Sequence, residues 1–453
     1  MGGAGGGVGE SGADEFGAGR VGYAELLRRN RDFRQLWLGQ VVSQLGDWFN
    51  TIAVYTLVMR LTGSGRAVGL VLVARFLPTI LLGPLAGVVA DRFDRRAVMI
   101  ASDIARALVV LGFLFVRRPE HLWLVYALTL LQLALSTFFE PAKTAAIPSV
   151  VSARELVPAN AVSSVTWSAM LTIGAAVGGE VAGRFGTDAA FVLDSVTYLG
   201  SALLIAAVRL PRRAERPKTK LTLARAVGLT ATLEGIAYVR PRRHVLALML
   251  AKPAWGLGGG MLSLLAVFGD RVFPVGGETA RGIGVLYAAR GVGTAIGPLV
   301  AARFAGRTRG SMRRAIGLSF LVGGVFYILF GAATNFYLAL VLLAFAHMGG
   351  SVLWVFSTTL LQESVDDEFR GRVFAAEMTL LTLTLAASNY ATGEALDRFG
   401  LSPRAVAVGV GCVFIIPGLV WFATARWWER PPSSIIAPRA EGARHEDAGH
   451  GEG

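Results

Sequence analysis

Runs of apolar residues, separated by short polar segments, cover most of the chain. There are twelve, at residues 34–59, 67–90, 97–116, 121–139, 159–182, 189–208, 245–268, 280–302, 315–334, 336–360, 373–396 and 404–425. Each run is long enough to cross the ~30 Å hydrocarbon core of a bilayer as an α-helix. The pattern therefore predicts an all-α integral membrane protein with twelve transmembrane helices.

Polar segments flank these runs and divide them into two sets. Residues 1–22 are rich in glycine and residues 429–453 are polar, so both predict disordered tails. The long segment 209–244 separates a six-helix bundle at 23–208 from a second bundle at 245–428. This segment predicts either an amphipathic helix on the membrane surface or a solvated linker with partial helix.

Lys and Arg are distributed unequally between the two sides of the predicted membrane. If the amino terminus is cytoplasmic, nine of the 44 basic residues lie in external loops, four lie inside runs and 31 are cytoplasmic. Cytoplasmic loops carry the excess of Lys and Arg in membrane proteins. Both termini are therefore predicted to be cytoplasmic.

Composition supports a membrane protein and excludes several other classes. Apolar residues make up 53% of the chain, charged residues 17%, and mean hydropathy is +0.54. The net charge of +13 is spread between the runs, which argues against a nucleic-acid partner. The single Cys412 and the unclustered histidines predict neither a disulfide framework nor a metal site. We expect no cofactor, no ATP-binding motif and no enzyme active site.

The two sets of six runs resemble each other at a nearly constant offset. The matching segments are 69–75 with 284–290, 83–85 with 297–299, and 179–186 with 393–400, at offsets of 215, 214 and 214. Equivalent helices at equivalent positions indicate a parallel duplication of a six-helix unit. Such repeats are typical of secondary transporters, whose binding site lies between the two halves near the middle of the membrane.

A charged motif ends the second run. It reads Gly87-Val88-Val89-Ala90-Asp91-Arg92-Phe93-Asp94-Arg95-Arg96 and follows Gly83. Small residues along this helix face allow a neighbouring helix to approach closely. We expect Gly87 to admit the eleventh helix and Asp91 to face the amino-terminal dipole of that helix. The predicted cytoplasmic gate comprises Gly83, Gly87, Asp91, Arg92, Arg95, Arg96, Gly371, Arg372 and Glu377.

With these residues in view, the span from about 30 to 428 resembles the major facilitator superfamily. Residues 87–96 are similar to its loop motif Gly-x-x-x-Asp-Arg-x-Gly-Arg-Arg, with Asp94 in place of the second Gly. The chain looks most like the twelve-helix exporters that include macrolide-efflux and enterobactin-export proteins. Further segments that resemble this branch are Leu45-Gly46-Asp47-Trp48, Pro141-Ala142-Lys143 after the fourth run, Pro158-Ala159-Asn160-Ala161 and Gly371-Arg372-Val373-Phe374-Ala375. The resemblance implies export by alternating access.

Two departures from drug antiporters concern proton coupling. The fifth run lacks the expected proline in Ile173–Gly179, and the fourth run has no Arg in Val125–Phe139. Coupling through that particular Arg is therefore not expected.

Charged residues inside the runs need partners or a water-filled cavity. The candidates for the central cavity and for proton coupling are Asp47, Arg75, Arg290, Asp103, Arg106 and Asp194. Asp47 and Arg75 lie roughly 18 and 12 Å from the external ends of their helices at 1.5 Å per residue, so we expect them to pair, as structural or proton-carrying groups. Asp103 and Arg106 can pair within one helix, which favours a structural role. Arg290 has no acid in the equivalent place and is a candidate to meet an anionic substrate or an acid across the cavity.

Two further pairs lie at predicted external helix ends. Glu180 with Arg184, and Glu394 with Arg398, are spaced i, i+4. This spacing indicates structural or gating ion pairs.

The sequence therefore predicts a monomeric, proton-coupled exporter in the cell membrane that binds a lipophilic drug-like or siderophore-like small molecule. Alternatives are a lysophospholipid flippase and, from a different class, a membrane receptor or scaffold that transports nothing.

Overall fold

A computed structural model describes residues 22–152, 154–210, 229–304 and 308–428, and these residues are almost entirely helical. The predicted tails, apart from Gly22, and residues 211–228 of the linker lie outside this part of the chain. The helices are α1 (Tyr23–Arg29), α2 (Arg31–Thr62), α3 (Gly65–Arg92), α4 (Arg95–Leu111), η1 (Gly112–Phe115), η2 (Pro119–His121), α5 (Leu122–Val150), α6 (Leu156–Ala206), α8 (Leu229–Val239), α9 (Arg243–Gly256), α10 (Met261–Arg271), α11 (Thr279–Phe304), α12 (Arg309–Ala332), α13 (Phe336–Ser364), α14 (Asp367–Asp397) and α15 (Pro403–Trp428).

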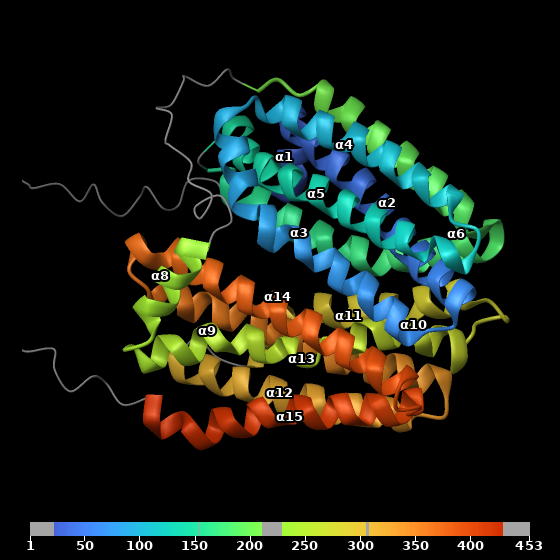
Figure 1. The fold of residues 1–453 in the computed structure, drawn as a ribbon. Helices are drawn as coiled ribbons and strands as arrows, with labels where there is room; N and C mark the ends of the chain where they lie inside the picture. Colours follow the sequence, from blue (N-terminus) through green and yellow to red (C-terminus); the bar gives the residue numbers. More distant parts are fainter. Residues whose placement is uncertain (1–21, 153, 211–228, 305–307, 429–453) are drawn as a thin grey trace, which may run out of the picture.

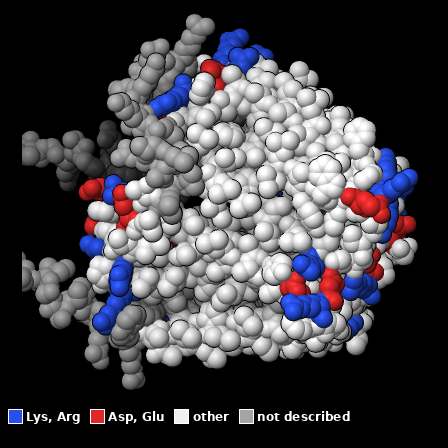
Figure 2. Space-filling view, in the orientation of Figure 1, with Lys and Arg blue, Asp and Glu red and all other residues white. Residues whose placement is uncertain are grey.

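The molecule has the surface of a multi-pass membrane protein. Figure 2 shows a broad uncharged band between two ends that carry the Lys, Arg, Asp and Glu side chains. Within the described residues, nine segments are long and apolar enough to cross a membrane. The count falls below twelve because α2 and α14 are not among them, and the fifth and sixth runs form one continuous segment, Pro158–Ala206. The number twelve stays a prediction.

Several helix boundaries follow from capping residues. Side chains of Asn30, Ser64 and Asp94 accept hydrogen bonds from the backbone three residues ahead, at 2.9, 3.0 and 2.7 Å. Each one satisfies an amide that the first helical turn leaves free. Asp94, which replaces a glycine of the loop motif, therefore starts α4. Inside α6, Gly186 has φ 85° and ψ 165°, so the chain breaks its helical path there.

The seventh predicted run is not one helix. It splits into α9 and α10 around Gly256–Gly260. A Cβ at Gly260 would lie 1.9 Å from Thr392 Oγ1 and one at Gly258 2.4 Å from Phe414 Cδ2, so only glycine lets α14 and α15 pack here. The Ser388 hydroxyl donates to Leu257 O at 2.6 Å and accepts from Gly260 N at 2.9 Å. These bonds replace helical hydrogen bonds that the break removes.

The fourth run also differs from its prediction. Residues 140–150 were expected in a loop, but α5 continues to Val150 with Pro141 and Pro148 inside it. Lys143 is consequently helical and 6% exposed. The segment Pro141-Ala142-Lys143 is therefore part of the helix wall and not a turn after it.

The helices form two groups. Figure 1 shows α2–α6 packed together above and α9–α15 packed together below. We call α1–α6 the amino-terminal group and α8–α15 the carboxy-terminal group. Helices α2, α3 and α6 of the first group contact α10, α11 and α14 of the second. Helix α8, within the predicted linker, packs on α14, where Thr232 Oγ1 lies 3.4 Å from Thr379 Oγ1.

Candidate functional site

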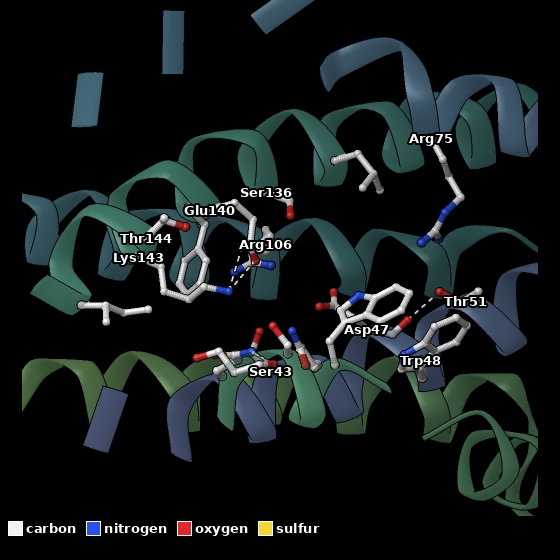
Figure 3. A pocket seen from close by; sticks show the side chains of 18 of the residues that line it. Ser43, Asp47, Trp48, Thr51, Arg75, Arg106, Ser136, Glu140, Lys143 and Thr144 are labelled. Atoms are coloured by element: carbon white, nitrogen blue, oxygen red, sulfur yellow. Dashed lines mark hydrogen bonds and ion pairs between the residues drawn. The ribbon is translucent and has the colours of Figure 1, made fainter. Parts of the chain in front are cut away.

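A polar cavity of about 520 Å³ lies among the helices of the amino-terminal group (Figure 3). Charged and amide groups, hydroxyls and aromatic rings share its wall. The lining residues include Gln40, Ser43, Gln44, Asp47, Trp48, Thr51, Arg75, Arg106, Ser136, Glu140, Lys143, Thr144, Asn160, Ser163 and Trp167. These side chains come from α2, α3, α4, α5 and α6. The cavity offers many hydrogen-bonding groups beside flat apolar surfaces.

Asp47 is held by a tyrosine that the sequence did not indicate. The Tyr198 hydroxyl of α6 donates to Asp47 Oδ1 and accepts from Gln132 Nε2 at 3.0 Å. The expected Asp47–Arg75 ion pair is absent from the described residues, although both side chains line the cavity. The partner of Asp47 is therefore the hydroxyl of Tyr198 and not the predicted guanidinium of Arg75.

Arg106 is the centre of a buried charge cluster. It forms an ion pair with Asp103, and its guanidinium lies between the rings of Tyr198, at 4.3 Å, and Phe139, at 4.7 Å. Its charge also acts on Asp47 and Asp194. The positive charge of Arg106 therefore interacts with three carboxyl groups. The predicted Asp103–Arg106 ion pair is present as one contact within this cluster. We call Asp47, Asp103, Asp194 and Arg106 the acid cluster.

Asp194 is fully buried and, like Asp103, has one carboxyl oxygen without a hydrogen-bond partner among the described residues. Gly46 brings α2 against it, because a Cβ there would lie 2.4 Å from Asp194 Oδ1 and 1.9 Å from Thr197 Oγ1. The Gly46-Asp47 sequence therefore places two carboxyl groups close together.

One end of the molecule is closed by ion pairs between the two groups. Arg66 of α3 lies 3.0 Å from Glu394 of α14, and Arg281 of α11 lies 3.0 Å from Glu180 of α6. The residues of the two pairs are related by the internal repeat, at offsets of 215 for Arg and 214 for Glu. We call this end, at the right in Figure 1, the closed end.

The predicted ion pairs Glu180–Arg184 and Glu394–Arg398 are present, in addition to the ion pairs that join the two groups. Arg184 contacts Glu180, and Arg398 lies 4.0 Å from Glu394. Each glutamate thus has one partner on its own helix and one from the opposite group. Asp397 adds a further contact across the groups, since it accepts from Ser64 Oγ at 2.6 Å and from Arg66 N at 2.8 Å.

Glycines allow the helices at the closed end to touch through their backbones. A Cβ at Gly284 would lie 2.7 Å from Gly179 Cα, and a Cβ at Gly393 would lie 2.5 Å from Arg66 Cα. A Cβ at Gly69 would lie 2.7 Å from Asn389 O. The equivalence of Gly69 with Gly284, and of Gly179 with Gly393, repeats the symmetry of the ion pairs.

The opposite end carries the predicted gate motif and has a different geometry. A Cβ at Gly83, Gly87 or Gly371 would meet no atom within 4 Å. The predicted close approach of α14 to Gly87 is therefore wrong for this conformation. Arg372 instead lies 3.0 Å from Glu234 of α8.

Two arginines of the gate motif bind helices of their own group. Arg95 donates to Ala145 O and, at 3.2 Å, to Ser149 Oγ of α5. Arg96 donates to Ala206 O at the end of α6. In this conformation these residues hold α4 to α5 and α6.

Glu377 was predicted to approach the gate motif, and this placement is wrong. It lies 2.7 Å from Lys252 Nζ of α9, with side chains 0% and 3% exposed. The ammonium also lies over the rings of Trp354, at 4.9 Å, and Phe374, at 5.4 Å. The carboxy-terminal group therefore contains a buried ion pair of its own.

Removal of one partner of this ion pair should be costly. We expect Lys252→Met to lower the free energy of unfolding by about 3–5 kcal/mol, because a buried carboxylate loses its cation. The double variant Lys252→Met/Glu377→Leu should recover most of the loss. Thermal unfolding of the purified single and double variants measures the loss of stability and its recovery. A double variant as unstable as the single one would contradict this account.

Comparison with known proteins identifies the family. The sequence model of the Major Facilitator Superfamily matches residues 36–380. The chain belongs to the Major Facilitator Superfamily. YfiS of Bacillus subtilis (strain 168), an uncharacterized MFS-type transporter, is 32% identical over 216 residues, 48% of this chain and 51% of YfiS. The chain spans about half the length of YfiS and of the B. subtilis relative YkuC.

Other relatives in the superfamily are named as exporters. Macrolide efflux protein A of Streptococcus pyogenes is 23% identical over 377 residues, 82% of this chain and 90% of that protein. The putative bacilysin exporter BacE of B. subtilis is 29% identical over 177 residues, 39% of this chain and 44% of BacE. Both names describe export proteins that this chain resembles over part or most of its length.

Solved structures of two transporters share the fold. A bacterial homologue of the human lysosomal transporter Spinster superimposes with a TM-score of 0.70 at 16% identity, over 90% of this chain and 100% of that chain. The POT family transporter PepTSo gives 0.69 at 13% identity, over 88% and 98%. At these identities the likeness shows the fold alone.

Several residues of this superfamily member became visible only in the structure. Tyr198 and Glu140 contact or line the cavity, and Arg66 and Arg281 close one end. The sequence signal for these two arginines was their equivalence in the internal repeat, at an offset of 215 residues.

Proposed function

We propose that the protein is a proton-coupled exporter of small molecules that works by alternating access. The two groups of helices would be two six-helix bundles, at 23–208 and 245–428, joined by the 209–244 linker. The proposal includes twelve membrane spans, cytoplasmic termini, a monomer and residence in the cell membrane. The polar cavity is the proposed substrate site.

The acid cluster is the observation that supports proton coupling. Three carboxyl groups share one cation, and Asp103, Arg106 and Asp194 are at most 1% exposed. If the two buried carboxyl groups, Asp103 and Asp194, were both ionised beside one guanidinium, one buried charge would lack compensation, which is very costly at low dielectric. At least one carboxyl group therefore holds a proton in this conformation. Asp47 borders the cavity and is the group best placed to exchange it.

The conformation fits one stage of an alternating-access cycle. With cytoplasmic termini, the closed end faces outward and the gate motif faces the cytoplasm. The cavity wall runs from Thr51 toward Ile147 and Asn160, nearer the cytoplasmic side. The position of the cavity supports an inward-open state, in which α14 is not packed against Gly83 and Gly87. Closure of that end would complete the gate predicted from the motif.

Substitution of Asp47 tests the coupling. Inverted vesicles with an acidic interior should accumulate an exported compound, and Asp47→Asn should abolish this accumulation while downhill movement persists. A permanently neutral side chain cannot release the proton that drives the cycle. The compound would come from a panel of macrolides, peptide antibiotics and siderophores, screened in cells without their own pumps.

The matched control for this experiment is Asp188→Asn, which removes an exposed carboxylate that pairs with Arg117 at 2.7 Å. It should accumulate the compound like the parent. Accumulation that ignores the pH gradient, or that survives in Asp47→Asn, would contradict proton coupling. Movement of lysophospholipids alone would favour the flippase, and binding without flux would favour a receptor.

A further inference from the structure

A second cavity lies in the carboxy-terminal group, apart from the proposed substrate site. It has a volume of about 600 Å³, and its wall is formed by α11, α12, α13 and α15. Helices α11 and α12 both pack on α13, which runs between them in Figure 1. The cavity shares no lining residue with the polar cavity. We call it the α12 groove, because half of its lining residues belong to that helix.

The α12 groove is apolar along most of its length and opens on the outer surface of the helices. The lining residues Leu318 and Phe422 are 54% and 41% exposed. The four helices that form the groove all contain segments that are long and apolar enough to cross a membrane. An exposed apolar surface on such segments favours contact with lipid chains. The groove therefore suits a hydrocarbon chain better than water.

The α12 groove has the depth of one leaflet of a bilayer. Its lining extends along α12 from Ser311 to Val322, which is about 16 Å at 1.5 Å per residue. Half of the ~30 Å hydrocarbon core is about 15 Å. Because α11 starts at the closed end, α12 starts at the end that carries the gate motif. Ser311 therefore lies near the membrane surface on that side, and Val322 lies near the middle of the bilayer.

Arg314 is the one charged residue in the described lining of the α12 groove. Its side chain is exposed, and Nε donates to Gly310 O at 3.4 Å. Within the part of the chain that the structure describes, no carboxylate forms an ion pair with it. Arg309, five residues earlier, differs because it lies 3.0 Å from Glu363. The groove thus combines an apolar wall with an uncompensated positive charge near the membrane surface.

This combination of charge and apolar wall fits an anionic lipid. A guanidinium group binds phosphate through paired hydrogen bonds, and basic pockets between transmembrane helices bind anionic headgroups. A zwitterionic headgroup brings a cation of its own, which Arg314 repels. We infer that the α12 groove binds one anionic phospholipid, with its phosphate at Arg314 and an acyl chain along Leu318 and Val322. With cytoplasmic termini, this lipid belongs to the cytoplasmic leaflet. The inference goes beyond the proposed function and requires neither proton coupling nor export.

Native mass spectrometry of the purified full-length protein in detergent tests the inference. The probes are dioleoyl phosphatidylglycerol, dioleoyl phosphatidylcholine, which has the same chains, and glycerol 3-phosphate, which has none. The first phosphatidylglycerol should bind at least about tenfold more tightly than the first phosphatidylcholine, the effect of one charged hydrogen bond. Glycerol 3-phosphate should bind more weakly than phosphatidylglycerol. Equal affinity for the two lipids overturns the inference, and glycerol 3-phosphate that binds as tightly as phosphatidylglycerol overturns it in favour of a free phosphate site.

Substitution of Arg314 assigns the headgroup preference to the groove. Arg314→Gln should weaken binding of phosphatidylglycerol about tenfold or more and leave binding of phosphatidylcholine unchanged. Arg309→Gln is the matched control, because it removes the same charge from the same end of α12 but outside the groove lining. It should bind both lipids like the parent. A preference for phosphatidylglycerol that survives in Arg314→Gln overturns the inference.

A second substitution assigns the acyl chain to the groove. Leu318→Trp fills the groove and should abolish the tight first binding step of phosphatidylglycerol. Leu329→Trp is the control, since Leu329 lies three turns later on the same face of α12, is 44% exposed and is outside the groove lining. Thermal unfolding like that of the parent shows that both variants are folded. Parent-like affinity in folded Leu318→Trp overturns the inference. These measurements involve no transport, so such a result leaves the proposed function intact.

Discussion

Replacement of Gly284 with leucine is expected to drive the protein out of the conformation described here and to stop transport. A Cβ at Gly284 would lie 2.6 Å from Ala175 O and 2.7 Å from Gly179 Cα. Both are backbone atoms of α6, so α6 and α11 must move apart. Overpacking of this kind costs about 1–3 kcal/mol, which changes the ratio of two conformations by roughly 5- to 150-fold. A cycle that needs both conformations then stalls.

Cysteine labelling measures this shift directly. The chain has one cysteine, so Cys412→Ser provides a background in which Ser136→Cys reports on the cavity. A membrane-impermeant maleimide added from the side of the gate motif should label Ser136→Cys more slowly when Gly284→Leu is present. Gly409→Leu is the matched control, because a Cβ there meets no atom within 4 Å. Parent-like labelling and transport in Gly284→Leu would refute the proposed close contact.

Replacement of Arg106 with leucine should strongly destabilise the protein. Arg106 is 1% exposed and compensates Asp103 directly, while its charge also acts on Asp47 and Asp194. Its removal leaves buried carboxylates without a cation, which costs about 3–5 kcal/mol. The midpoint of thermal unfolding of the purified protein should fall accordingly, and transport should be lost.

Two comparisons distinguish this mechanism from a general loss of packing. Arg117→Leu removes an exposed ion pair with Asp188 and should cost less than about 1 kcal/mol. The double variant Asp103→Leu/Arg106→Leu should be more stable than Arg106→Leu, because it buries one carboxylate fewer. A double variant that is less stable than the single one would refute the charge account.

The helical architecture could be predicted from apolar runs, because the bilayer requires each span to satisfy its own backbone. The predicted helix boundaries were wrong where tertiary contacts determine them. The break at Gly256–Gly260 depends on Ser388 and on the close packing of α14 and α15, neither of which hydropathy records. The extension of α5 past Pro141 was hidden because polar and proline residues there resemble a loop.

The sequence predicted part of the membership of the candidate site: of the six predicted cavity residues, Asp103, Asp194 and Arg290 are not in its lining. The pairing of the side chains was not predictable. Asp47, Arg75 and Arg106 were recognised because charges stand out within apolar runs, and all three line the cavity. Their partners depend on helix rotation, which a sequence does not record. Tyr198 therefore replaced Arg75 as the partner of Asp47, and Glu377 met Lys252.

The symmetry of the closed end has a consequence for how the chain was assembled. The Arg66–Glu394 and Arg281–Glu180 pairs use equivalent residues of the two groups, so each group supplies one Arg and one Glu. A contact in which residue i meets j and j meets i is isologous, the kind that joins two identical subunits. A single six-helix unit with this Arg and this Glu could thus have made the same seal against a second copy of itself, and fusion of the two genes would have required no new contact there.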